Sequence, residues 1–465
     1  MFTPSEARSL TRIGLVRVVG LLVALVTASL AFGLTAPTSA QAAVASAPMF
    51  GVQFHGVWGN YTDATRAQVL DTLKANGAKT VRIDVSWRML EPDAPGVFNS
   101  WGLATVDKAI TMAASRGLKP LVTLWMTPKW ATGSDNERLA PTSATALNAL
   151  TDVSKRLAVR YNGKVDAWEV WNEPNNADFM PGADPVVYAK VLAAASKGFK
   201  AGSPATPVVF AGTSYVDDEW IGKALAAGAA GKYDVMGVHP YMAVADLAPD
   251  LADDGTMWRM NHLPNLINVM GKYGEAKKPI WFTEFGWSVH PTPAGTANWA
   301  RGVTPAQATD YLNRTVALVK AKYPTVARVY WYKDRADSAD VNNTGYGLVL
   351  PNGKPTPTLT AAKAIFAAPV APVKPAAPAS LTVTATSKAT VATARWTAPT
   401  NATVTGYTVQ LRRVDRPSTA TTQVAATTLT TNFTVVKGGT YQVAVAATNA
   451  AGSGAYKVSA PFTVR

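Results

Sequence analysis

Short apolar runs alternate with longer amphipathic stretches through most of the chain. The apolar runs are rich in Val, Ile, Phe and Trp, which is typical of strands buried in a parallel sheet. We expect eight such strands, at Phe50–Phe54, Thr80–Val85, Pro120–Leu124, Ala167–Val170, Val208–Ala211, Val235–Val238, Ile280–Thr283 and Val326–Trp331. The stretches between them have helical spacing, as at Ala64–Asn76, Leu103–Arg116, Ala144–Arg160 and Pro185–Ala201.

This alternation of strands and helices predicts an α/β fold, a (β/α)8 TIM barrel, over residues 48–367. Eight strand–helix units in about 320 residues fall within the size range of this fold. A doubly wound open sheet is the structural alternative, but it usually has fewer strands and often a glycine-rich phosphate-binding turn. The sequence contains no such turn, so we expect the barrel.

The pattern changes after a short segment rich in proline and alanine. Residues 368–379 read APVAPVKPAAPA, a composition typical of an extended, semi-rigid linker. Only short alternating strands follow, and residues 380–465 resemble a small all-β fibronectin type III domain. Trp396 and Tyr441 occupy the positions at which such β-sandwiches keep a core tryptophan and a corner tyrosine.

The first 42 residues have the pattern of a secretion signal. Three arginines precede an apolar run from Val18 to Leu34, and AQA at 40–42 supplies the small residues of a cleavage site. An uncleaved membrane anchor is the alternative, but the run is short for a bilayer and no basic stop follows it. We expect cleavage after Ala42 and a secreted, extracellular protein, free or associated with the cell wall, without a membrane segment.

The amino-acid composition excludes several classes of chemistry. The chain has 48% hydrophobic residues, no cysteine and only four histidines. Disulfides, thiolate chemistry and cysteine-bound metals are therefore excluded, and so few histidines argue against a catalytic metal. We expect no cofactor and no metal, and nothing in the sequence predicts an oligomer, so we expect a monomer.

The chain is basic, and much of the excess lies near its end. The formal charge is +14, of which the first 42 residues, with three Arg and one Glu, contribute +2. Residues 380–465 hold eight Lys or Arg and one acid, Asp415. Because no nucleic-acid motif accompanies this charge, we expect no nucleic-acid partner. The charge instead favours an anionic cell-wall or exopolysaccharide surface.

Two glutamates stand where two predicted strands end. Glu173 follows the fourth strand in WEVWNEPN, and Glu284 ends the seventh in WFTEFGW. Active sites of barrels lie at the carboxyl ends of the strands. Strands four and seven lie on opposite sides of the mouth, so the carboxylates should face each other. The alternative is that both glutamates cap loops and pair with surface cations, which does not account for two such strand ends among tryptophans.

Two opposed carboxylates are what glycoside hydrolysis requires. One must be protonated to release the leaving oxygen, and the other must be ionised to attack or stabilise an oxocarbenium-like centre. Asn172 is a natural partner for the sugar 2-hydroxyl. The residues alone do not separate retaining from inverting enzymes, since that depends on a carboxylate separation of about 5 Å or of about 6.5 Å and more.

The barrel segment resembles the clan A glycoside hydrolases, among them families 39 and 5. WNEPN at 171–175 and FTEFGW at 282–287 carry most of the likeness, which covers roughly Phe50 to Ala367. Further matches are VRIDVSWRMLEP from Val81, TLWMTPKWA from Thr123, HPY from His239 and GYGLVLPNGKPTPT from Gly345. The resemblance implies a retaining β-glycosidase with Glu173 as acid/base and Glu284 as nucleophile.

The same resemblance implies supporting roles around the two glutamates. Arg82 would support the nucleophile, and His239 and Tyr241 would flank it. Trp331 would form the floor of the first sugar subsite. His55 is a candidate for contact with a sugar hydroxyl, with an equally good structural interpretation. Other tryptophans at or just past strand ends are candidates for stacking on sugar rings: Trp58, Trp87, Trp125, Trp171 and Trp287.

Arg82 also has a structural interpretation. Its neighbours along the strand are apolar and should face the helices, which leaves Arg82 pointing into the barrel. A buried arginine needs a carboxylate, either Asp84 in a structural pair or Glu284 in a functional one, and we favour Glu284. Glu169 precedes Glu173 by about 13 Å along an extended strand, so we expect a structural carboxylate, a candidate partner for Arg82.

Together these features favour a glycosidase that hydrolyses O-glycosyl bonds of a β-linked polysaccharide or oligosaccharide outside the cell. Two alternatives stay open. One is a non-catalytic carbohydrate-binding or adhesion protein on a barrel scaffold, in which both glutamates would be dispensable. The other is a transglycosidase that uses the same two glutamates. The accessory domain and the strand-end tryptophans favour a polymeric substrate.

Overall fold

The computed structural model describes residues 47–465, except 338–339, 368–373, 386–389, 401, 403, 417 and 450. The predicted signal, residues 1–42, lies outside the described residues, and so does the first half of the predicted linker. Among the described residues, no helix combines the length and the apolar character needed to cross a bilayer.

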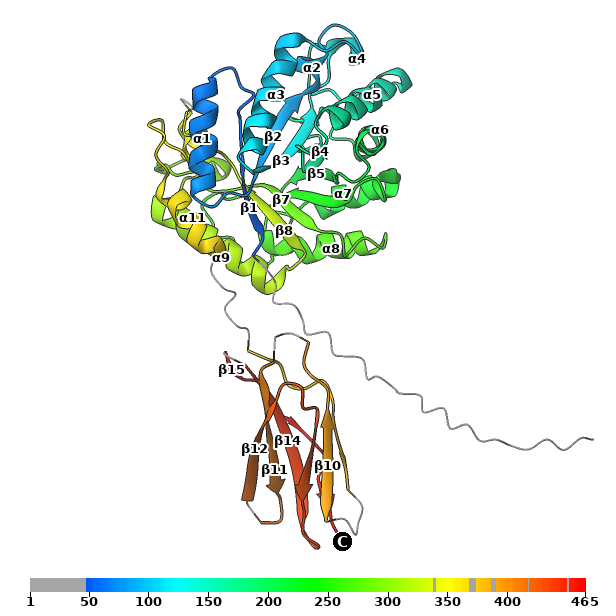
Figure 1. The fold of residues 1–465 in the computed structure, drawn as a ribbon, viewed down its shortest axis with the longest axis vertical. Helices are drawn as coiled ribbons and strands as arrows, with labels where there is room; N and C mark the ends of the chain where they lie inside the picture. The colour runs from blue at the N-terminus through cyan, green and yellow to red at the C-terminus, as the bar shows by residue number, and fades with distance from the viewer. Residues whose placement is uncertain are drawn as a thin grey trace, which may run out of the picture. The chain divides into compact units, whose positions relative to one another are not determined.

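Eight parallel strands form a closed barrel, in which the strands pair in chain order and the last returns to the first (Figure 1). The strands are β1 (Met49–Gln53), β2 (Thr80–Ser86), β3 (Lys119–Trp125), β4 (Ala167–Val170), β5 (Val208–Ser214), β6 (Val235–His239), β7 (Ile280–Phe285) and β8 (Val326–Trp331). They are the eight strands expected from the apolar runs, with bounds that agree to within a few residues. The prediction of a (β/α)8 barrel is therefore confirmed.

Helices surround the barrel (Figure 1). The α-helices are α1 (Asp63–Ala75), α2 (Trp87–Leu90), α3 (Ser100–Ser115), α4 (Lys129–Thr132), α5 (Ala144–Arg160), α6 (Pro185–Gly202), α7 (Asp218–Ala224), α8 (Leu263–Gly271), α9 (Pro305–Lys322), α10 (Val341–Gly345) and α11 (Pro357–Ala367). Three short elements accompany them: η1 (Leu225–Ala229), η2 (Met260–His262) and η3 (Asn298–Ala300). Thr62, Asn99 and Ser143 cap α1, α3 and α5 by accepting a backbone N–H, which explains where these helices begin.

The barrel separates an outer apolar layer from a mixed interior. On β2, Val81, Ile83 and Val85 join the large apolar cluster that includes helix residues, so the alternate residue Arg82 points inward, as expected. A small apolar layer fills the interior near the beginning of most strands, formed by Leu121, Ala167, Val209, Val235, Trp281 and Tyr330. This layer closes the barrel from below, and polar side chains occupy the interior toward the strands' carboxyl ends.

The C-terminal residues form two antiparallel sheets. One has the order β13 (Thr430–Thr434), β10 (Val391–Trp396), β9 (Leu381–Thr384). The other has the order β12 (Ser418–Ala425), β11 (Gly406–Arg413), β14 (Thr440–Asn449), β15 (Gly452–Ser453), and β14 also pairs with β16 (Lys457–Val458) and β17 (Phe462–Thr463). Trp396 and Tyr441 are buried in the core, and the Tyr441 hydroxyl accepts the Val436 backbone N–H at 3.1 Å. The expected core tryptophan and corner tyrosine are both found.

Candidate active site

The segment after β4 has an unusual backbone. Trp171 and Glu173 have left-handed φ angles of 77° and 43°, a conformation that costs a non-glycine residue about 1–2 kcal/mol. Two backbone hydrogen bonds of 3.0 Å hold it, from Trp171 to the Leu124 carbonyl and from Glu173 to the Gly212 carbonyl. Strain of this kind persists where the surroundings fix it, and here it sets the position of the Glu173 carboxylate.

A break in strand pairing presents Glu284. The register between β7 and β8 shifts between Phe282 and Phe285, and such irregularities re-aim side chains. Phe282 and Phe285 both lie in the outer apolar cluster. Thr283 and Glu284, between them, both contact polar residues of the interior.

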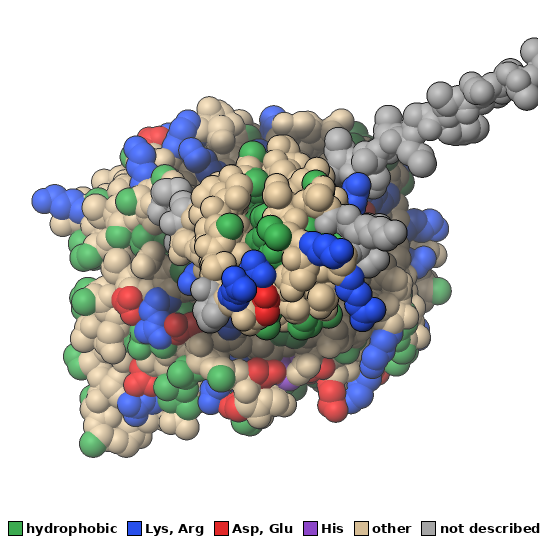
Figure 2. Space-filling view, turned by 90° about the horizontal axis from the view of Figure 1, so that it is seen from below, with side chains coloured by type: hydrophobic (Ala, Val, Ile, Leu, Met, Phe, Trp, Pro, Cys, Tyr) green, Lys and Arg blue, Asp and Glu red, His purple; other side chains and the backbone are tan. Residues whose placement is uncertain are grey.

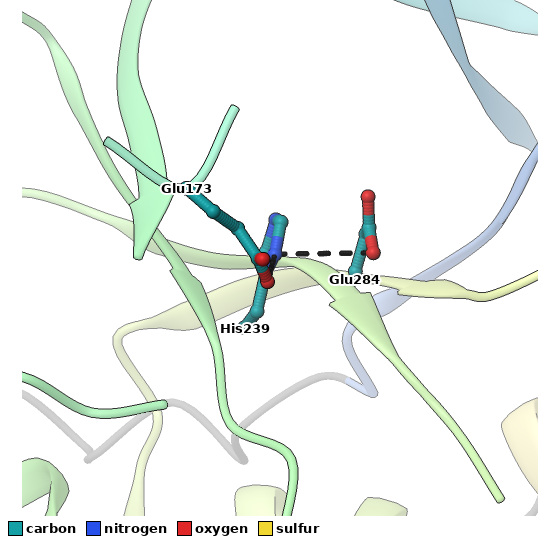
Figure 3. Close-up of side chains that lie close together, drawn as sticks. All are labelled: Glu173, His239 and Glu284. Atoms are coloured by element: carbon teal, nitrogen blue, oxygen red, sulfur yellow. Dashed lines mark hydrogen bonds and ion pairs between the residues drawn. The ribbon is translucent and has the colours of Figure 1, made fainter. Parts of the chain in front are cut away.

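Glu173 and Glu284 both point toward His239, which ends β6 (Figure 3). His239 Nδ1 lies 2.8 Å from Glu173 Oε1 and 3.8 Å from Glu284 Oε2. One oxygen of each carboxylate and one ring nitrogen all lie within 4.8 Å of one another. The structure thus brings together the two glutamates indicated by the strand ends, together with the histidine of the HPY motif.

The position of His239 depends on a glycine on the neighbouring strand. A Cβ atom at Gly212 would lie 2.1 Å from His239 Nε2 and 2.4 Å from Thr283 Oγ1. Thr283 Oγ1 itself is 3.1 Å from His239 Nε2. Any side chain at Gly212 would therefore displace the imidazole from the two carboxylates.

Arg82 is fully buried and connects the polar groups of the barrel mouth. Its guanidinium donates to acceptors on three other strands and on the segment after β4: Glu169 Oε2 at 2.6 Å, Glu284 Oε1 at 2.6 Å, Gln53 Oε1 at 2.8 Å and Asn172 Oδ1 at 2.8 Å. The expected functional contact with Glu284 is present, and Asn172 is held by the same side chain.

Glu169 is a buried carboxylate paired with Arg82, as expected, but the extended path assumed between Glu169 and Glu173 is wrong. The strand ends at Val170, and two of the next three residues are left-handed. One guanidinium consequently contacts both Glu169 and Asn172, the residue before Glu173. Asp84 lies farther from the guanidinium, 3.5 Å from Arg82 Nη1, and is the weaker partner.

The charges of this cluster shift its protonation. Burial raises the pKa of Glu284, and the positive charges of His239 and Arg82 oppose that rise. Burial lowers the pKa of His239, but the carboxylates of Glu284 and Glu173 outweigh burial and raise it above its ordinary value. His239 therefore carries a positive charge at pH values at which a free histidine is neutral.

A cavity of about 350 Å³ opens at Glu173, and Tyr241, which contacts Glu284, also lines it. Its wall includes four tyrosines, Tyr215, Tyr241, Tyr332 and Tyr346. Burial raises the pKa of all four, so their hydroxyls stay neutral. Tyr241 donates to Glu284 Oε2 at 3.3 Å, the contact suggested by the HPY motif.

Trp331 does not line this cavity, which corrects the expectation that it floors the first subsite. Its side chain is 1% exposed and packs against Phe285 at 5.5 Å and Trp287 at 6.0 Å between ring centroids. Side chains alternate along a strand, and Trp331 falls on the outward face of β8. The next residue, Tyr332, lines the cavity instead, a position that the alternation of β8 would have indicated.

Most of the other strand-end tryptophans are also packing residues. Trp87, Trp125, Trp171 and Trp287 are all buried. Trp125 and Trp171 meet edge to face at 6.4 Å, and Trp171 Nε1 donates to the carbonyl of Phe179, a residue that lines the cavity. Trp125 and Trp171 therefore pack against a residue of the cavity wall without lining the cavity themselves.

His55 also lies outside the cavity lining. It is 3% exposed, and its Nδ1 is 3.2 Å from Asp334 Oδ1. Asp334 accepts a second hydrogen bond, from the Tyr61 hydroxyl at 2.7 Å. The structural interpretation of His55 therefore fits this arrangement better than direct contact with a sugar.

The loop after β6 forms one side of the cavity through Met242 and Ala245. Its shape rests on ion pairs, because four aspartates along it each pair with a cation: Asp246 with Arg301, Asp250 with Arg314, Asp253 with His262 and Asp254 with Arg259. Burial lowers the pKa of His262, but hydrogen bonds to Asp253 and Asp218 outweigh burial and raise it.

Loop residues of the cavity were missed from the sequence. Tyr215 directly follows β5 and Trp299 belongs to η3 in the loop after β7, and no periodic pattern marked either residue. Trp299 is 66% exposed. Tyr346 belongs to the stretch from Gly345 that carried the family likeness, but the likeness gave it no role.

Among the described residues, Glu173, His239 and Glu284 are also close enough to hold a metal ion. Arg82, 2.6 Å from Glu284, already supplies a positive charge there, and His239 is already hydrogen-bonded to Glu173. The arrangement suits proton transfer and nucleophilic attack better than a cation. The absence of a metal stays a prediction.

A model of the family Cellulase (glycosyl hydrolase family 5) matches residues 39–288, more than half of the chain. The chain belongs to glycosyl hydrolase family 5. A fibronectin type III domain model matches residues 376–465, in agreement with the two antiparallel sheets. As a family 5 member, the protein is a glycosidase, and a carbohydrate substrate fits its family.

Solved structures similar to this family 5 enzyme have the clan A fold. A family 39 glycoside hydrolase from Bacteroides cellulosilyticus WH2 has a TM-score of 0.56 and 19% identity, over 84% of this chain and 81% of that one. A monomeric β-xylosidase from Caulobacter crescentus CB15 has 0.52 and 16%, over 84% and 95%. An exo-β-1,4-mannosidase from Opitutaceae bacterium strain TAV5 has 0.52 and 16%, over 71% and 61%.

Replacing Arg82 by Met would leave Glu169 buried without its counter-charge. We expect the free energy of unfolding, measured by urea denaturation, to fall by about 3–5 kcal/mol. The double variant Arg82→Met/Glu169→Gln should recover part of this loss, because the uncompensated charge is gone. The exposed cation Lys223, changed to Met, is the control and should change stability by less than about 1 kcal/mol. Equal losses in the single and double variants would contradict the pairing.

Tyr241→Phe removes a hydrogen bond that favours the ionised form of Glu284. A nucleophile with a raised pKa is active only above that pKa, so activity is lost as pH falls through it. The variant should raise this pKa further and move the acidic limb of the kcat/KM profile to higher pH. Tyr215→Phe, which changes a hydroxyl in the same cavity, should leave the acidic limb in place. An unmoved limb in Tyr241→Phe would refute the contact.

Proposed function

We propose that this family 5 enzyme is a secreted retaining β-glycosidase that hydrolyses a β-linked polysaccharide or oligosaccharide through a covalent intermediate on Glu284. The observation that carries the proposal is the short separation of the two carboxylates, whose facing oxygens lie within 4.8 Å. Retaining enzymes keep the two carboxyl groups about 5–5.5 Å apart, whereas inverting enzymes need about 6.5–9.5 Å to admit a water.

In the first step, protonated Glu173 donates its proton to the glycosidic oxygen while Glu284 attacks the anomeric carbon. The bond from that carbon to the leaving oxygen breaks, and an ester bond to Glu284 forms. Arg82 and Tyr241 both donate to the Glu284 carboxylate, and these contacts favour the ionised form that attacks. Asn172, fixed by Arg82 at 2.8 Å, is placed beside Glu173 for contact with the sugar.

In the second step, Glu173 is a carboxylate and takes a proton from the attacking water. The water oxygen bonds to the anomeric carbon, and Glu284 is released as a carboxylate. His239, 2.8 Å from Glu173 and with a raised pKa, stabilises the ionised acid/base at this stage. The two steps invert the anomeric carbon twice, which retains its configuration.

The β linkage is supported by the family description and by the names of the similar structures. The matching family model is described as cellulase, and two similar structures are named as a β-xylosidase and an exo-β-1,4-mannosidase. Secretion rests on the signal-like sequence before Ala42. A transglycosidase would use the same first step. It would differ only in the second step, in which a sugar hydroxyl instead of water attacks the glycosyl ester.

Azide rescue tests the nucleophile. Glu284→Ala should lower kcat on an aryl β-glycoside by about three orders of magnitude or more, since the attacking group is lost. Added azide fits the space left by the carboxylate and should restore activity, with an α-glycosyl azide as the product identified by NMR. Glu219→Ala, at an exposed glutamate, is the matched control and should keep parent activity.

The outcomes separate the alternatives. Rescue with a β-glycosyl azide as the product would show that Glu284 is the acid/base and Glu173 the nucleophile. If the parent and Glu284→Ala show the same rate of hydrolysis on every β-glycoside, the proposed mechanism is wrong. The protein would then be a non-catalytic carbohydrate-binding protein. Products longer than the substrate in the parent reaction would identify transglycosylation.

We further propose that the C-terminal domain retains the enzyme on an anionic surface. Five of the cations that the structure describes in this domain are exposed: Arg395, Arg416, Lys437, Lys457 and Arg465. Its acid Asp415 is paired with Arg413 at 3.0 Å. In Figure 2 the Lys and Arg side chains are dispersed rather than gathered into one patch, which suits attraction to a charged polymer more than recognition of one group.

Deleting residues 368–465 should reduce retention on isolated cell walls at low salt and leave aryl-glycoside hydrolysis unchanged. Salt screens exposed charges over about 8–10 Å at 0.1–0.15 M, so the difference between the full chain and the truncated chain should vanish at high salt. Retention is measured by co-sedimentation. Equal retention of both chains at low salt would refute the role of this domain.

A further inference from the structure

A second groove, of about 380 Å³, lies at the carboxyl end of β1, between the start of α1 and the start of α3. The loop after β1, the start of α1 and the first turns of α3 form it, and Figure 1 shows α1 and α3 on the same side of the barrel. An ion pair of 2.9 Å between Asp63 and Lys108 joins these two helices. The groove's size falls within the range of ligand-binding sites.

Two exposed tryptophans line the groove. Trp58 is 41% exposed and Trp101 is 63% exposed, whereas most strand-end tryptophans of the barrel are buried. Exposed large apolar side chains that gather at one groove are typical of ligand-binding sites. Their flat faces suit the C–H groups of sugar rings, as aromatic side chains offer a large apolar surface with a polar edge.

Part of the groove's lining is charged, and its charged side chains contact one another. Asp63 accepts from Lys108 and, at 2.7 Å, from Arg66. Arg66 is also fixed by a 2.5 Å hydrogen bond to the Gly56 carbonyl. These opposite charges pair with one another, and the exposed side chains of Asp63 and Lys108 keep donors and acceptors free for hydroxyl groups. The lining therefore suits an uncharged glycan better than an ionic ligand.

The groove adjoins the catalytic cavity. The His55 ring lies tilted against Trp58, with 3.9 Å between ring centroids, and meets Tyr332 edge to face at 5.6 Å. Trp58 lines the groove, and Tyr332 lines the cavity. One imidazole therefore separates the two. Helices of this fold start where strands end, so both hollows lie at the same mouth of the barrel.

We propose that the groove is a distal subsite for an uncharged β-linked glycan whose scissile bond lies between Glu173 and Glu284. Trp58 and Trp101 stack on sugar rings, and Asp63 and Lys108 bond to hydroxyls. The inference rests on the proposed function and extends it, because the site makes the enzyme favour a polymer over a short glycoside.

Kinetics on long and short substrates test the subsite. The quantity measured is the ratio of two kcat/KM values, that for the polysaccharide on which the enzyme acts divided by that for the aryl β-glycoside of the same sugar. Trp101→Ala should lower this ratio by about tenfold, or ~1.4 kcal/mol, mainly through KM on the polymer. Trp101→Phe keeps an aromatic face and should retain most of the parent ratio. Tyr273→Ala, which removes an aromatic side chain that is 39% exposed and outside the groove, should leave it unchanged.

A binding measurement separates failure of the subsite from failure of the proposed function. Glu284→Gln and Glu284→Gln/Trp101→Ala are run in native gels that contain soluble β-glucan, mannan or xylan. We expect one polymer to retard the first protein and to retard the second much less, whether or not the parent turns over any glycoside. Equal retardation of both proteins, no retardation by any polymer, or an unchanged kinetic ratio in Trp101→Ala would overturn the proposal.

Discussion

The hydrogen bonds of the buried Arg82 guanidinium are the interactions on which the arrangement of the other active-site residues depends. It joins acceptors from β1, β4 and β7 and holds Asn172 next to Glu173. An arginine suits this place because its planar fork donates in several fixed directions and keeps its charge when buried. The same charge that compensates Glu169 inside the barrel also favours the ionised nucleophile, so stability and chemistry share one residue.

His239 supplies a second positive charge beside the two catalytic carboxylates. Two carboxylates at short separation would repel each other, and a cation beside them makes the pair tolerable. The imidazole sits in space left free by Gly212 and touches both glutamates. In each step of a double displacement one carboxyl group is neutral or esterified. The fixed cations therefore face a cluster whose negative charge changes little during the cycle.

The barrel and its two catalytic glutamates could be predicted from the sequence because both depend on local patterns of residues. Apolar runs located the eight strands, and the glutamates after the fourth and at the end of the seventh marked the mouth. The errors came from side-chain direction: Trp331 was assigned to the cavity although the alternation of β8 turns it outward, toward Phe285, and turns Tyr332 inward. The left-handed backbone at Trp171 and Glu173 and the loop residue Trp299 depend on tertiary contacts, which no local pattern records.

The loop after β6 is held in a different way from the barrel that carries it. Apolar burial maintains the barrel, whereas pairs such as Asp253–His262 and Asp246–Arg301 maintain the loop. His262 differs from the three arginines that pair with this loop, because an imidazole can lose its charge whereas a guanidinium keeps it. Deprotonation of His262 would remove the charge attraction to Asp253 and leave the pairs of Arg259, Arg301 and Arg314 in place. The wall of the cavity is therefore attached to the barrel by contacts of two kinds, of which only one depends on a proton.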